Sequence, residues 1–172
     1  MSGSLIKIDE EIVTSAVASV TLGGIDSTYD VYMLRANNVT STTDNGSIRA
    51  RVTVSGTPDT SANYDNAYKL LNTTAFTNQS NTNMTSWEFA GGTGTGTGET
   101  VQNILYLFNF NNASQYSFTT WENATFNHQP QLYGAQGGNV HTVAQACNGI
   151  QFFGDIGNIQ TGSQFVLYGL KK

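Results

Sequence analysis

The C-terminal residues form two short apolar segments separated by a glycine-containing loop. Residues 149–153 read Gly-Ile-Gln-Phe-Phe and residues 163–169 read Ser-Gln-Phe-Val-Leu-Tyr-Gly, with Gly157, Asn158 and Ile159 between them. Short segments that are rich in aromatic and β-branched residues and bounded by turn formers predict β-strands. Because the second segment runs almost to Lys172, we expect the C-terminal strand to lie within the sheet.

The same pattern recurs along the chain and predicts an all-β protein. Ile48–Ser55 alternates apolar and polar residues, whereas Tyr29–Leu34 and Ile104–Phe110 are nearly continuous apolar runs, as in central strands that are covered on both faces or lie at a protein interface. Weaker strand signals cover residues 16–22, 85–89, 116–121 and 140–144. Clusters of Gly, Asn, Asp or Pro separate these segments. We therefore expect an antiparallel two-sheet β-sandwich that is jelly-roll-like.

Two further segments carry a helical spacing and a turn sequence, respectively. Tyr64, Tyr68 and Leu71 have helical spacing within residues 63–71, but this window is short, and a loop or a strand fits it equally well. Val39–Ser47 contains Asp-Asn-Gly between two apolar runs and predicts a hairpin connection.

The length of 172 residues is that of one domain with its own core. We assign residues 1–14 to an N-terminal arm or first strand, and residues 15–172 to a single β-sandwich domain. Cys147 is the only cysteine, so an intrachain disulfide is impossible.

Charge argues against two classes of partner. Charged residues make up 11% of the chain, with a net charge of −5, so a basic stripe for nucleic acid is missing. No apolar run is long enough for a membrane helix, and Asp9, Glu10 and Glu11 lie where a signal peptide would need a basic start. We expect no nucleic-acid partner, no membrane insertion, and synthesis as a soluble chain in the cytoplasm.

The sequence offers few candidates for chemistry. His128 and His141 have no zinc-binding spacing, and the small apolar neighbours of Cys147 favour a buried structural thiol over a nucleophile paired with His141. Asp59 and Asp65 lack a calcium-loop pattern and are typical turn formers.

The glycine-rich segment Gly91–Gly98 is not followed by the Lys-Ser/Thr of a phosphate loop and predicts a flexible connection. Most of the acidic residues are scattered singly, which neither favours nor excludes a glycosidase pair. We predict no catalytic residue, no cofactor-binding residue, no metal ligand and no enzymatic activity.

Aromatic residues are plentiful, with two Trp, eight Tyr and nine Phe. Such side chains fill a core or a subunit interface. Exposed Trp or Tyr beside Asn and Asp would equally serve a sugar-binding patch, because a flat ring packs on the apolar face of a pyranose while amides bond its hydroxyls.

Several segments carry a resemblance to a known class of proteins. They are residues 5–13, 29–32, 51–60, 157–162 and 165–172, the last including Leu-Tyr-Gly. In these segments the chain resembles small virion structural proteins of tailed bacteriophages, particularly marine phages. The resemblance covers nearly the whole chain and implies an exterior capsid decoration, head fibre or tail fibre tip, often a trimeric β-sandwich. It supplies no catalytic residue.

The sequence and the resemblance together predict a noncatalytic bacteriophage virion structural protein. We expect a homotrimer that attaches to other phage virion proteins on the virion exterior after synthesis in the host bacterial cytoplasm. Met1–Val13 would dock as an arm or first strand, and Ile104–Phe110 would supply subunit contacts. The alternative is a receptor-binding or carbohydrate-binding module of a phage tail fibre that binds a host surface glycan. A glycan-degrading enzyme is a third reading and would require facing carboxylates in a cleft.

Overall fold

The computed structural model describes residues 4–171, which form thirteen β-strands and no helix. This part of the chain therefore has no helix that could span a membrane. The strands are β1 Leu5–Ile12, β2 Ser19–Gly23, β3 Val31–Val39, β4 Gly46–Val54, β5 Thr57–Pro58, β6 Tyr64–Asn72, β7 Phe76–Met84, β8 Trp87–Thr93, β9 Val101–Phe108, β10 Ser117–Phe126, β11 Leu132–His141, β12 Gly149–Gly154 and β13 Gln164–Leu170.

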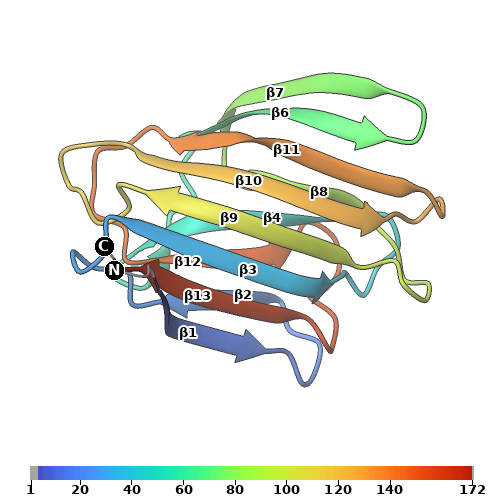
Figure 1. The fold of residues 1–172 in the computed structure, drawn as a ribbon, viewed down its shortest axis with the longest axis horizontal. Helices are drawn as coiled ribbons and strands as arrows, with labels where there is room; N and C mark the ends of the chain where they lie inside the picture. Colours follow the sequence, from blue (N-terminus) through green and yellow to red (C-terminus); the bar gives the residue numbers. More distant parts are fainter. Residues whose placement is uncertain (1–3, 172) are drawn as a thin grey trace.

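The strands form two antiparallel sheets packed as a β-sandwich. The larger sheet has eight strands in the order β1-β13-β3-β9-β10-β11-β6-β7. The smaller sheet has five: β2, β12, β4 and β5 follow one another, and β8 also pairs with β4. Figure 1 looks onto the larger sheet, with β12, β4 and β8 behind it. The all-β, two-sheet prediction is confirmed.

Eight of the strands follow the jelly-roll order. They are, along the chain, β1, β2, β3, β4, β8, β9, β12 and β13. The larger sheet contains the first, eighth, third and sixth of them side by side, and the smaller sheet contains the second, seventh, fourth and fifth. The chain thus passes repeatedly between the two sheets, which is the double Greek key of a jelly roll.

Two hairpins are added to this framework, and both extend the larger sheet. The β10–β11 hairpin pairs with β9, and the β6–β7 hairpin pairs in turn with β11. The smaller sheet gains only the two-residue strand β5, which pairs with β4 as β8 does, so it ends at β8 and β5. The larger sheet therefore extends past the edge of the smaller one, as β6 and β7 do in Figure 1.

The core between the sheets is built around contacting aromatic rings. The ring centroids of Phe89 and Phe152 are 6.1 Å apart, and those of Phe152 and Phe165 are 5.0 Å apart. Trp87 is fully buried, and its indole nitrogen donates a hydrogen bond of 3.1 Å to the carbonyl of Val140. These rings join β8 and β12 of the smaller sheet to β13 and β11 of the larger sheet, and their burial supplies much of the hydrophobic stabilisation.

Some local predictions differ from the structure. For the window 63–71, the strand alternative is confirmed, because Tyr64–Asn72 forms β6. Val39–Ser47 is not a hairpin connection, because β3 and β4 belong to different sheets. The strand predicted over 140–144 instead ends at His141 and begins at Leu132. Strand β7 was missed because its residues are almost all polar and exposed, which gives no alternating pattern.

Candidate functional site

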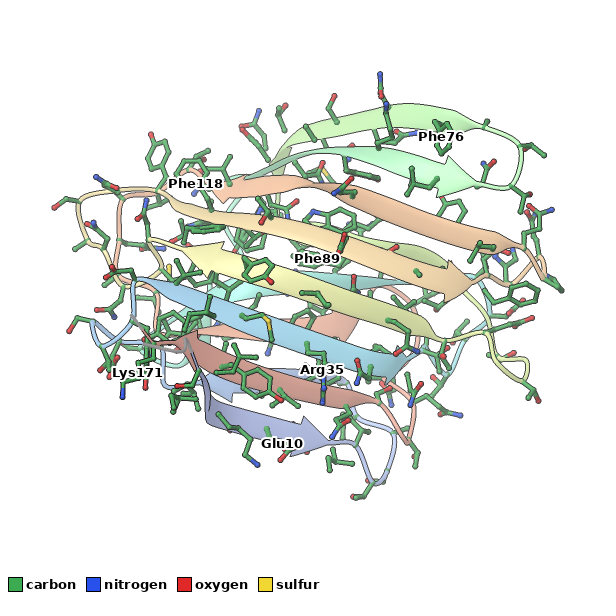
Figure 2. The ribbon with its side chains drawn as sticks, viewed as in Figure 1. Glu10, Arg35, Phe76, Phe89, Phe118 and Lys171 are labelled. Carbon is green, nitrogen blue, oxygen red and sulfur yellow. The ribbon has the colours of Figure 1, made fainter. Side chains whose placement is uncertain are left out.

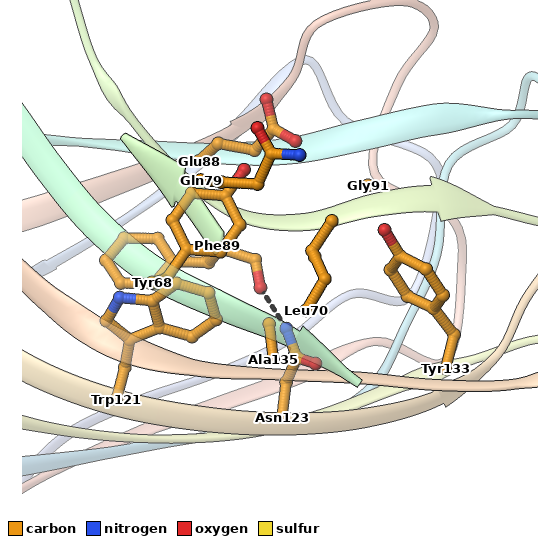
Figure 3. A pocket seen from close by; sticks show the side chains of 10 residues that line it. All are labelled: Tyr68, Leu70, Gln79, Glu88, Phe89, Gly91, Trp121, Asn123, Tyr133 and Ala135. Atoms are coloured by element: carbon orange, nitrogen blue, oxygen red, sulfur yellow. Dashed lines mark hydrogen bonds between the residues drawn. The ribbon is translucent and has the colours of Figure 1, made fainter. Parts of the chain in front are cut away.

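A pocket lies where the larger sheet extends past the edge of β8. Its volume is about 250 Å³. It is formed by inward-facing residues of β6, β7, β10 and β11 together with the edge strand β8, as Figure 3 shows. The lining residues are Tyr68, Leu70, Gln79, Glu88, Phe89, Gly91, Trp121, Asn123, Tyr133 and Ala135. The pocket is thus a product of the two added hairpins.

The floor of the pocket is an aromatic pair that depends on a glycine. Gly137 lies in register between Trp121 on β10 and Tyr68 on β6. A Cβ at Gly137 would clash with the Cβ of Tyr68 and lie 2.5 Å from the carbonyl oxygen of Ala67. Because Gly137 has no Cβ, the rings of Tyr68 and Trp121 lie with their centroids 5.5 Å apart. Trp121 is only 4% exposed, and its indole nitrogen already donates to Asn139 Oδ1 at 3.3 Å.

Glu88 is the one acidic residue that lines the pocket. Its Oε2 lies 3.3 Å from Arg49 Nη2 on the neighbouring strand β4, so the negative charge has a direct partner. Burial raises the pKa of Glu88 above its ordinary value, and the attraction of Arg49 offsets only part of that rise. The other oxygen, Oε1, lies beside Gly91, where an added Cβ would be 3.0 Å away.

Two tyrosine hydroxyls and one amide oxygen add further polarity. Burial raises the pKa of Tyr68 to about 12, and burial also raises the pKa of Tyr133, with Glu88 adding to both shifts. The side-chain nitrogen Nδ2 of Asn123 donates a hydrogen bond to the backbone carbonyl oxygen of Phe89, and that oxygen can only accept. Its Oδ1 is buried and has no hydrogen-bond partner within residues 4–171. An unsatisfied buried acceptor is costly, so this oxygen would gain from a donor if a shift of the Asn123 side chain brought it to the pocket surface.

The lining residues of the pocket do not include the carboxylate pair of a usual glycosidase. A glycosidase of the usual type needs two carboxyl groups on either side of the scissile bond. Only Glu88 among the lining residues has a carboxylate, and that carboxylate is paired with Arg49. The groups that remain are directional hydrogen-bonding atoms set between aromatic and aliphatic side chains.

Cys147 and His141, the Cys and His pair considered from the sequence, are both buried with no measurable exposure. The Cys147 thiol lies 3.8 Å from Ser117 Oγ, and burial raises its pKa to about 11. No hydrogen bond joins Cys147 to His141 in the described part of the chain. A protonated thiol enclosed in the core is a structural side chain and not an accessible nucleophile.

His141 instead pairs with Asp59. The distance from His141 Nε2 to Asp59 Oδ2 is 3.1 Å, and Gln145 and Ser61 also donate to the same carboxylate. Burial lowers the pKa of His141, and Asp59 opposes this effect only in part. For Asp59, burial favours the neutral form, but the hydrogen bonds from Ser61 and Gln145 and the attraction of His141 together outweigh it and lower the pKa. This cluster joins the 59–61 turn to β11.

The other candidate sites also have structural explanations. Asp59 and Asp65 are not part of a metal-binding group, since residues 4–171 contain no cluster of three or more His, Cys, Asp or Glu side chains suited to a metal. In the glycine-rich segment, residues 91–93 belong to β8. The amide of Gly96 donates to Glu99 Oε2 at 2.8 Å, so this amide already has an internal carboxylate as its partner.

A second surface feature is the outer face of the larger sheet. The described chain has eleven large apolar side chains that are exposed, and the alternation of the strands places eight of them on this face. They are Leu5, Ile12, Phe76, Ile104, Tyr106, Phe118, Phe126 and Leu132. Figure 2 shows this face, with Phe118 and Phe76 labelled.

No protein-family profile and no curated protein matches the sequence. The pocket itself was not predicted from the sequence, although the two tryptophans and the abundance of tyrosine were noted. Its residues come from five strands and meet only through the register of β6, β10 and β11. The one local signal is the Gly-Gly pair at 137–138 within a strand, which is typical of close side-chain approach.

Proposed function

We propose that the chain is a noncatalytic structural protein of a bacteriophage virion, an exterior decoration or fibre-type component that forms a homotrimer. The observation that carries this proposal is the concentration of exposed apolar side chains on the outer face of the larger sheet. Contiguous apolar patches on a soluble domain mark interaction surfaces. The jelly roll supports the proposal, because this architecture recurs in capsid and lectin domains.

The two outer faces of the sandwich differ in character. The smaller sheet presents Arg49, Arg51, Thr21 and Gln151, whereas the larger sheet presents Ile104, Tyr106 and Phe118 near its centre, with Arg35 and Glu122 in register with Ile104 on the same face. A polar face remains soluble as an exterior, and an apolar face gains free energy when it is covered. Copies of the chain that pack their larger sheets together leave the smaller sheets outside, which fits a closed oligomer.

Size-exclusion chromatography with light scattering tests this proposal. The unmodified chain should have the mass of a trimer, and Phe118→Glu should lower that mass, because it places a charge within the apolar face without disturbing the core. Thr21→Glu is the matched control, since it places the same charge on the polar face. A monomeric unmodified chain, or equal masses for Phe118→Glu and the unmodified chain, would contradict the proposal.

Attachment to the virion needs a separate experiment. The chain should copurify with particles of the phage that encodes it, and a reconstruction of those particles should place it on the exterior. A trimer that is consistently absent from purified particles would leave the oligomer in place but refute the virion role.

A further inference from the structure

We infer that the pocket bounded by β8 and the two added hairpins binds a single neutral sugar ring. This inference does not depend on self-association, because the pocket is lined by inward-facing residues and the proposed subunit contacts are outward-facing. It assigns a ligand class and a place to the carbohydrate-binding alternative raised by the sequence.

The size of the pocket limits the ligand to about one ring. Its volume of about 250 Å³ is below the range of roughly 300–1,000 Å³ typical for drug-sized ligands. A pyranose fits such a space, whereas further residues of a longer glycan would lie outside it.

The charge balance favours a neutral ligand. The only carboxylate that lines the pocket, Glu88, has Arg49 Nη2 at 3.3 Å, and Arg49 also approaches Asp155 at 3.9 Å. A cationic ligand would compete with an existing guanidinium, and an anionic ligand would face Glu88. Neutral hydroxyl groups meet neither obstacle.

The remaining polar atoms match a polyhydroxylated ring. Glu88 Oε1 lies beside Gly91 and accepts one hydrogen bond, and Asn123 Oδ1, which is buried without a partner, accepts another once a shift of its side chain exposes it. The hydroxyls of Tyr68 and Tyr133 donate or accept, and Figure 3 shows them on either side of Leu70. The alternation of rings and hydrogen-bonding atoms suits a sugar, whose ring has apolar faces and a polar rim.

The test is isothermal titration calorimetry of the full 172-residue chain. The probes are the methyl glycosides of glucose, galactose and mannose, then N-acetylglucosamine, with choline chloride as a cationic comparison. We expect saturable binding of at least one sugar and none of choline. If no sugar binds, or if choline binds instead, the inference is overturned.

Variants then locate the site. Tyr133→Phe removes one hydroxyl and should weaken the affinity roughly three- to tenfold, the usual effect of one hydrogen bond. Gly91→Ala should weaken it at least as much, because the added methyl group lies 3.0 Å from Glu88 Oε1. Tyr116→Phe is the matched control, since it removes an exposed hydroxyl from the loop between β9 and β10.

The variants must first be shown to be folded by thermal denaturation. Unchanged affinity in both Tyr133→Phe and Gly91→Ala, or an equal loss in Tyr116→Phe, would place the sugar elsewhere and refute the inference. Titration of the Phe118→Glu variant separates the two proposals. Binding retained in a monomer supports the pocket, and binding that requires the oligomer contradicts a site formed within one chain.

Discussion

The two adjacent glycines of β11 should respond in opposite ways to the same substitution. In Gly137→Ala the new methyl group points inward, where it meets the Cβ of Tyr68 and the carbonyl oxygen of Ala67. In Gly138→Ala it points outward, and its nearest neighbour is the carbonyl oxygen of Thr119 at 3.6 Å, an ordinary contact. Neither glycine has a positive φ, so the difference comes from packing alone.

The expected magnitudes follow from these contacts. Overpacking of a filled site costs about 1–3 kcal/mol, which for a domain of this size lowers Tm by roughly 2–12 °C. Gly137→Ala should lie in this range, because the backbone oxygen of Ala67 cannot move without disturbing the β6–β11 ladder. Gly138→Ala should leave Tm unchanged or raise it slightly, since alanine restricts the unfolded chain.

Thermal denaturation followed by circular dichroism measures both shifts, with light scattering to confirm that the variants share one oligomeric state. Near-ultraviolet spectra give a second readout, because displacement of Tyr68 alters its contact with Trp121. Equal Tm values for the two variants, or a Gly137→Ala chain as stable as the original, would refute the assignment of Gly137 as the position that admits the aromatic pair.

Three further predictions concern the core. Cys147 should react with a thiol reagent only when the chain unfolds, because it is fully buried and its pKa is raised to about 11; labelling of the folded chain at mildly alkaline pH would contradict this. The stability should fall as pH drops below about 6.5, since the lowered pKa of His141 lets the unfolded chain bind a proton more readily than the folded one; urea midpoints at neutral and acidic pH should show this fall diminished in His141→Gln. Phe152→Ala should cost about 3–5 kcal/mol in urea unfolding because Phe152 contacts Phe89 and Phe165; Phe153→Ala, on the same strand but stacked under Arg51 at 4.2 Å, should cost far less.

The sequence predicted the strands of the jelly roll where one face is apolar. Ile48, Ala50 and Val52 are fully or almost fully buried in β4, as their alternation with polar residues indicated. The segment 149–153 likewise forms β12 nearly as predicted. In such strands the apolar residues face the core and the polar residues face solvent, so the local pattern is sufficient to predict the strand.

Pairing between strands was harder to predict. The Asp-Asn-Gly sequence at 44–46 is typical of a tight turn, but a turn does not reveal whether its flanking strands pair. Here β4 turns away into the smaller sheet and pairs with β12 and β8. Strand β7 gave no apolar signal because it is an edge strand whose residues mostly face solvent, so it is held by its ladder to β6. The pocket depends on these pairings, so it could not be predicted from the sequence.

The arrangement of the added hairpins separates two surfaces on the same strands. Alternate residues of β10 face opposite ways, so that Trp121 and Asn123 line the pocket while Phe118 lies on the outer face. A trimer built through the outer faces would therefore leave each pocket open. Three weak sites held on one rigid particle component gain effective concentration toward a glycan-covered surface, so an affinity that is low for one ring becomes useful for the assembly. The two proposals are independent in their tests, but together they explain why the larger sheet extends past the smaller one.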